Sequence, residues 1–146
     1  MSYYTEKAES DLHRGLVTDL LGWLKNSKGY RITAADLSGY SEPGVVENKS
    51  KVGDGDDKQP DIDAFDDTER VYVRGEAKTG NGDLTSEHSK TQFLLFSDRF
   101  NRENNKESLL YVIVPASKMN ELKAVLSELG LADKDNVIPV KSGKYQ

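Results

Sequence analysis

Two acidic residues and a lysine occupy neighbouring apolar segments in an arrangement suited to chemistry. Asp61 follows Pro60, and Glu76 lies two residues before Lys78 at the end of a run rich in β-branched residues. Alternate residues of a strand share a face, so Glu76 and Lys78 point the same way. Two carboxylates about 4 Å apart repel by roughly 4 kcal/mol at an effective dielectric near 20, a cost that a divalent cation removes.

Mg²⁺ suits such a pair, because this cation binds through one or two carboxylates together with waters and a substrate phosphate. Mn²⁺ is the alternative cation, since it also prefers oxygen ligands. A lysine beside the metal supplies a charge that orients a metal-bound water or stabilises a pentavalent phosphorus. The three side chains therefore predict metal-dependent phosphodiester chemistry.

The elements that must position these residues follow from the apolar periodicity. Leucines four apart from Leu12 to Leu24 predict an amphipathic helix over 5–25. Strands are predicted at 30–37, 60–65, 70–78, 108–115 and 136–141, the fourth fully buried and the last an edge strand that tolerates Pro139. Two further helices are predicted at 86–101 and from Ser117 to Leu129, with Ser86 and Ser117 as N-caps.

The hairpin between the second and third strands determines how closely the two acids approach. If the turn DDTE places Asp66 opposite Glu69, then Asp61 lies opposite Arg74 and diagonal to Glu76. Diagonal neighbours have Cα atoms roughly 7–8 Å apart, which is close enough for two carboxylates to share one ion. The opposite face of the third strand is small and apolar.

Composition indicates one α/β domain over residues 1–146, with a long polar loop at about 38–59. The net charge of −5 argues against a protein that coats nucleic acid through bulk positive charge, but not against a local basic patch. The absence of cysteine excludes disulfides and thiolate sites. No apolar stretch approaches the roughly 20 residues of a membrane span, so a cytoplasmic protein without membrane partners is expected.

The Pro60-Asp61 pair and the Glu76-Ala77-Lys78 triplet resemble the motif of the PD-(D/E)XK nuclease superfamily. The predicted αβββαβ order is similar to the restriction-endonuclease-like core of that superfamily, here with a C-terminal αβ extension. The resemblance implies a Mg²⁺-dependent nuclease acting on nucleic acid, most naturally DNA, and leaving a 5′-phosphate. It also implies that Asp61, Glu76 and the Ala77 carbonyl hold the metal while Lys78 positions the attacking water.

Two further positions extend the resemblance. Glu9 on the first helix is similar to a metal-linked acid of Holliday junction resolvases and helicase-associated exonucleases, and Glu6 competes for that role. Gln92 resembles the glutamine of the QxxxY element in the RecB-like branch, although Phe96 replaces the tyrosine. The branch within the superfamily stays open.

The basic residues near these positions are predicted to contact phosphates. They are Arg74, Lys90 and Arg99, with Lys49, Lys51 and Lys58 on the long loop. His88 is expected on the surface, within reach of a phosphate as the alternative, and His13 receives no role. Three other hypotheses remain, namely a catalytically inactive module of the same fold, a protein-interaction factor, and one subunit of a homodimer or larger nuclease complex.

Overall fold

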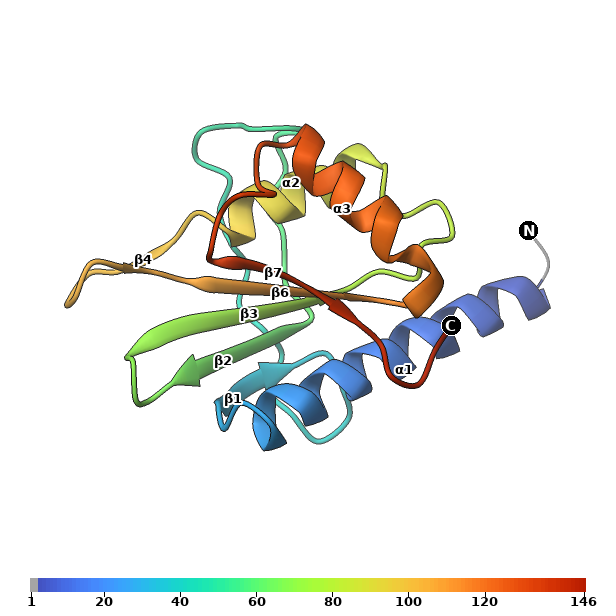
Figure 1. Ribbon diagram of the computed structural model, residues 1–146, viewed down its shortest axis with the longest axis horizontal. Coiled ribbons are helices and arrows are strands. Elements are labelled where there is room, and N and C mark those ends of the chain that lie inside the picture. The colour runs from blue at the N-terminus through green and yellow to red at the C-terminus, as the bar shows by residue number, and fades with distance from the viewer. Residues whose placement is uncertain (1–2) are drawn as a thin grey trace.

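The amphipathic first segment forms helix α1 (Tyr3–Asn26) in the computed structural model, which describes residues 3–146 and is shown in Figure 1. Leu16, Leu20 and Leu24 are fully buried, because their spacing of four places them along one stripe of the helix. This stripe packs against one face of a five-stranded sheet. The helix predicted over 5–25 is therefore confirmed.

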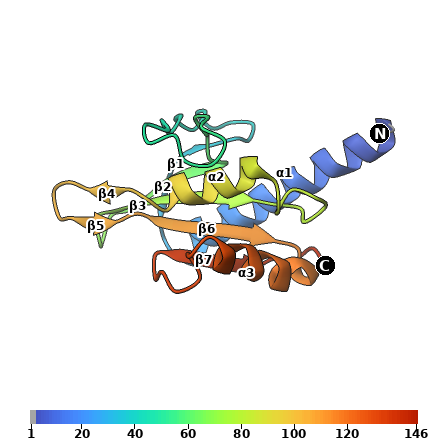
Figure 2. The ribbon, with the colours of Figure 1, turned by 90° about the horizontal axis from the view of Figure 1, so that it is seen from above.

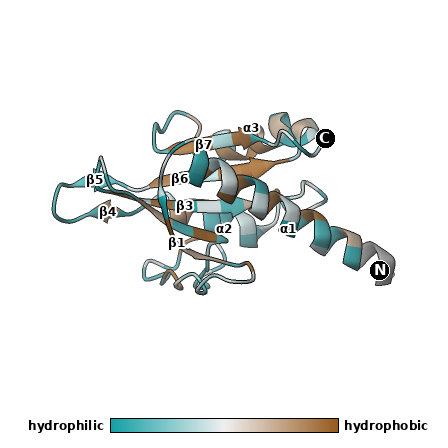
Figure 3. Cartoon of the chain, turned by 90° about the horizontal axis from the view of Figure 1, so that it is seen from below, coloured by the Kyte–Doolittle hydropathy of each residue, from teal (hydrophilic) through white to brown (hydrophobic). Residues whose placement is uncertain are grey.

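The sheet is mixed, with the strand order β1-β2-β3-β6-β7. Strands β1 (Arg31–Ala35), β2 (Ile62–Asp66) and β3 (Val71–Ala77) form an antiparallel meander. Strands β6 (Leu109–Val114) and β7 (Val137–Lys141) continue parallel to β3. The prediction of a central buried strand and a final edge strand is confirmed, and β6 is among the most hydrophobic segments in Figure 3.

Helices α2 (Glu87–Phe96) and α3 (Met119–Glu128) cover the face of the sheet opposite α1, as Figures 1 and 2 show. Phe93 and Phe96 of α2 are fully buried there with Leu110 and Val112 of β6. The mixed α/β class follows directly from these two layers around one sheet.

The predicted hairpin register is wrong by two residues. Asp66 pairs with Val71 and Asp63 pairs with Arg74, so the turn occupies residues 67–70. The Asp66 carboxylate accepts hydrogen bonds from the backbone N–H groups of Thr68 and Glu69, which lengthens the turn. Asp61 consequently lies beside Glu76 and not opposite Arg74.

The apolar face of β3 allows α1 to approach closely. A Cβ atom on Gly75 would lie 3.0 Å from Leu20 Cδ2 and 3.2 Å from Ile62 Cβ. A glycine at this position therefore lets helix and sheet pack at short range. The polar side chains of β3 are directed to the other face, towards α2.

The predicted helix over 86–101 ends early. Ser86 caps α2 as expected, accepting a hydrogen bond from the Ser89 N–H, but the helix stops at Phe96. The chain then forms the small hairpin of β4 (Phe100–Asn101) and β5 (Lys106–Glu107), which projects from the body in Figure 2. The cap predicted at Ser117 is also wrong, because a 3₁₀ turn, η1 (Ala116–Lys118), precedes α3 and no side chain caps that helix.

The long loop over 38–59 docks against α2. The Asp54 N–H donates to Thr91 Oγ1 at 3.0 Å, and an isolated bridge joins Val46 to Lys58. Asn48 is buried and bonds to the loop backbone at Val52 and elsewhere. Within residues 3–146, none of the helices is both long enough and apolar enough to cross a bilayer.

Candidate active site

Asp61 and Glu76 meet where β2 begins and β3 ends. The Asp61 N–H donates to Glu76 Oε1 at 3.2 Å, and the Ala77 N–H donates to Asp61 Oδ2 at 2.8 Å. These bonds use backbone groups at the strand ends, so the fold itself holds the two carboxyl groups together. The register difference brings the acids closer than the diagonal arrangement predicted from the sequence.

The pKa values of the two acids are shifted in opposite directions. Burial, followed by the negative charge of Asp61, raises the pKa of Glu76 well above its ordinary value. Burial alone would also raise the pKa of Asp61, but hydrogen bonds from His13, Glu76 and the Ala77 N–H lower it overall. One acid is thus readily ionised while its neighbour resists ionisation without added positive charge.

Lys78 supplies part of that positive charge. Its Nζ lies 3.1 Å from Glu76 Oε2 and donates a second hydrogen bond to Gln92 Oε1 on α2 at 2.5 Å. All three side chains are buried. Since Glu76 and Gln92 hold the ammonium from two sides, Lys78 is fixed at the acidic pair.

His13 on α1 completes this group, although the sequence assigned it no role. Its Nε2 lies 3.3 Å from Asp61 Oδ2. The hydrogen bond to Asp61 is the largest effect on the pKa of His13 and raises it, while burial opposes the rise. The available signal was its position four residues after Glu9, on the same face of the helix.

The donor atoms at this position fit a small hard cation. Asp61 and Glu76 offer carboxylate oxygens, the ligands that Mg²⁺ prefers, and burial and the charge of Asp61 raise the pKa of Glu76. The N–H and C=O of a strand residue point to the same side, so the Ala77 carbonyl faces the edge of β3 where its N–H meets Asp61. Among residues 7–146, no group of three or more acids, histidines or cysteines is placed to hold a metal ion.

Glu9 is not brought into contact with the acidic pair. Its Oε1 accepts a hydrogen bond from Asn81 Nδ2 at 3.1 Å, in a hollow that His13 and Asp83 also line. His13 lies four residues, about 6 Å, further along α1 and is the residue of that helix that contacts Asp61. The side chain of Glu6 lies outside the described residues.

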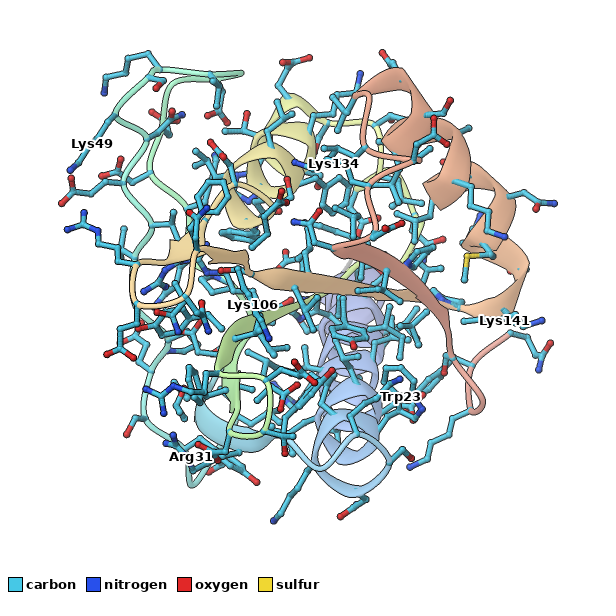
Figure 4. The ribbon with its side chains drawn as sticks, turned by 60° about the vertical axis from the view of Figure 1, so that its left-hand side comes forward. Trp23, Arg31, Lys49, Lys106, Lys134 and Lys141 are labelled. Carbon is cyan, nitrogen blue, oxygen red and sulfur yellow. The ribbon has the colours of Figure 1, made fainter. Side chains whose placement is uncertain are left out.

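Of the basic residues predicted to contact phosphates, only the two arginines lie together. Arg74 and Arg99 line one hollow on the same side of the sheet as Glu76. Lys90 lies two residues before Gln92 on α2, about 200° around the helix, and pairs with Glu128 at 3.2 Å. Lys49 extends outward from the loop in Figure 4.

Lys58 differs from the expectation, because it is buried. Its Nζ donates to Asp54 Oδ2 at 2.7 Å and lies 2.8 Å from His88 Nδ1. Burial, then the charges of Lys58 and Lys78, lower the pKa of His88. Lys58 therefore links the loop to α2 and is not available to bind a phosphate. His88 is exposed and lies one helical turn before Gln92.

The chain was compared with protein-family models, curated proteins and solved structures, and no match was found in any of the three.

Proposed function

We propose that this chain is a Mg²⁺-dependent nuclease with a PD-(D/E)XK-type site on a restriction-endonuclease-like core, acting most naturally on DNA. The observation that carries the proposal is the convergence of Asp61, Glu76 and Lys78, with Gln92 holding the lysine. Asp61 directly precedes β2, Glu76 and Lys78 lie at the end of β3 and directly after it, and Gln92 lies on α2. An ion pair made only for solubility needs no such burial.

The proposed roles follow from the positions of the groups. Asp61, Glu76 and the Ala77 carbonyl would hold Mg²⁺, which would supply Lewis-acid stabilisation of the scissile phosphate. The contacts of Asp61 with His13 Nε2 and with the Ala77 N–H both engage Oδ2 of its carboxylate.

Lys78 would act on the water and on the phosphate. Its ammonium can release Glu76 to the cation while keeping the bond to Gln92, which fixes the direction of Nζ. A fixed ammonium orients the attacking water and stabilises the charge that builds on the phosphate oxygens. Hydrolysis would leave a 5′-phosphate.

The first test is Mg²⁺ or Mn²⁺ binding by calorimetry, since it requires no knowledge of the substrate. Wild-type protein is expected to bind at millimolar or lower concentration, and Glu76→Ala is expected to lose the binding. Glu121→Ala is the matched control, because Glu121 is an exposed acid on α3.

Two outcomes would contradict the proposal. Binding that survives in Glu76→Ala would assign the cation to the loop aspartates. No binding at all would favour an inactive module of this fold or a protein-interaction factor. When binding depends on Glu76, a screen of single strands, duplexes, flaps and junctions follows with the same variants.

A further inference from the structure

A second hollow lies beside the acidic pair on the same side of the sheet. Its volume is about 380 Å³, within the range of small-ligand pockets. Arg74 and Arg99 line it together with the aromatic rings of Phe65 and Tyr72. Arg74 precedes Glu76 by two residues on β3, so the hollow begins only about 6.6 Å along the strand from the proposed metal ligand.

Arg74 is a buried cation whose guanidinium is only partly satisfied by the described part of the chain. Only 5% of the residue is exposed, and within the described residues neither Nε nor Nη1 has a partner. Its guanidinium lies over the Phe96 ring, 5.9 Å from the centroid. A guanidinium carries its charge at neutral pH. An unpaired buried charge of this kind is costly unless an anion joins it.

The neighbouring groups leave the hollow positive. Asp63 lies opposite Arg74 in the sheet, yet within residues 7–146 the two side chains form no ion pair. Even with Asp63 ionised, two guanidinium groups and one carboxylate sum to +1. Arg31, at the rim and labelled in Figure 4, is already paired with Asp67 at 3.0 Å.

Aromatic rings alternate with these cations. Phe65 and Tyr72 meet edge to face with centroids 5.3 Å apart, and the Arg99 guanidinium lies 4.1 Å from the Tyr72 centroid. Tyr72 and Arg99 also line an adjoining hollow that contains Arg102 and the exposed Phe100. Alternating basic and aromatic side chains along a groove are typical of sites for single-stranded nucleic acid, whose unstacked bases lie against rings.

We propose that the hollow binds one nucleotide of a single-stranded nucleic acid, with its phosphate at Arg74 and Arg99 and its base against Phe65 and Tyr72. This proposal rests on the proposed nuclease function, because only a cutting site at Glu76 determines that the bound nucleic acid runs from the hollow towards Glu76. A base-paired nucleotide cannot present its phosphate and its ring to one hollow of this size, because its base is stacked within the duplex. The substrate is therefore unpaired next to the cut.

The test measures binding of a fluorescent eight-nucleotide single strand and of the matching duplex by anisotropy, in low salt without metal. The single strand is expected to bind at least tenfold more tightly than the duplex. Arg99→Ala and Arg74→Met are each expected to weaken binding of the single strand about tenfold. Lys25→Ala is the charge-matched control, because Lys25 is exposed on α1, which covers the opposite face of the sheet.

Thermal unfolding shows whether Arg74→Met is folded, and exposed Arg99 provides a second variant that does not depend on it. Equal affinity for single strand and duplex, unchanged affinity in Arg99→Ala, or no binding of either nucleic acid would overturn the inference. Loss of Mg²⁺ binding is measured separately, so failure of the nucleotide site and failure of the metal site remain distinguishable.

Discussion

His13 Nε2 lies 3.3 Å from Asp61 Oδ2, joining helix α1 to the start of β2 across 48 positions of the chain. The contact meets the same carboxylate oxygen that accepts the Ala77 N–H, and it lowers the pKa of the carboxyl group. Residues that hydrogen-bond to a metal ligand commonly determine its orientation and its affinity for the metal. His13 is therefore a positioning residue for the proposed metal site.

Replacing His13 by alanine is expected to weaken Mg²⁺ binding about tenfold, because Asp61 loses an orienting partner. His13→Gln, which keeps an N–H donor, is expected to recover part of the affinity. Calorimetry on the three proteins measures both effects, with exposed Lys7→Ala as the control on the same helix. Equal affinity in wild type and His13→Ala would show that the contact is only structural.

Mg²⁺ is expected to stabilise the wild-type protein but not Glu76→Gln. A ligand that binds only the folded state, present at ten times its dissociation constant, raises the free energy of unfolding by about 1.4 kcal/mol. For a domain of this size, that corresponds to a rise of about 4 °C in the melting temperature. The buried pair of Glu76 and Asp61 is the reason, since a cation relieves their repulsion. Differential scanning fluorimetry with and without Mg²⁺ measures the shift, and Glu121→Gln should shift as wild type does. An equal shift in Glu76→Gln would contradict the assignment.

Lys78→Met is expected to lower the rate of strand cleavage at least about 100-fold, the usual effect of removing a group that stabilises the reacting charge. Mg²⁺ binding should persist, because Lys78 is not a proposed ligand. Gln92→Leu, which removes only the partner of Lys78, is expected to lower the rate less. Single-turnover assays with calorimetry separate the two quantities. A Lys78→Met protein that cleaves normally would remove the lysine from the mechanism.

The local pattern of the chain was enough to predict the order of the main helices and strands and the proximity of Asp61 to Glu76, although not the hairpin register or the β4–β5 hairpin. Leucine spacing identified α1, and the apolar run at 109–114 identified the buried strand β6. The hairpin register was predicted incorrectly because the Asp66 side chain bonds two backbone N–H groups and Arg70 adopts φ 57°. The side-chain hydrogen bonds and the positive φ angle are specific to this turn, and neither produces a periodic pattern in the sequence.

Contacts between distant segments could not be predicted from the sequence. His13 meets Asp61 only after α1 packs across the sheet, and Lys58 meets His88 only after the loop folds onto α2. The unpartnered state of Arg74 likewise depends on Phe96 and Asp63, which three-dimensional packing brings near it. Sequence patterns report which face a residue occupies, whereas these relationships depend on which elements become neighbours.

Gly75→Ala is expected to destabilise the protein by about 1–3 kcal/mol, the usual cost of adding a methyl group to a filled core. The new Cβ would lie 3.0 Å from Leu20 Cδ2 and 3.2 Å from Ile62 Cβ, so α1 must move away from β3. Gly22→Ala is the matched control, because nothing lies within 4 Å of its added Cβ on α1. That variant should gain about 0.5–1 kcal/mol, since alanine favours helix. Urea unfolding measures the free energy of unfolding of both variants. A Gly75→Ala protein as stable as the wild type would show that α1 and β3 are not tightly packed at this position beneath the acidic pair.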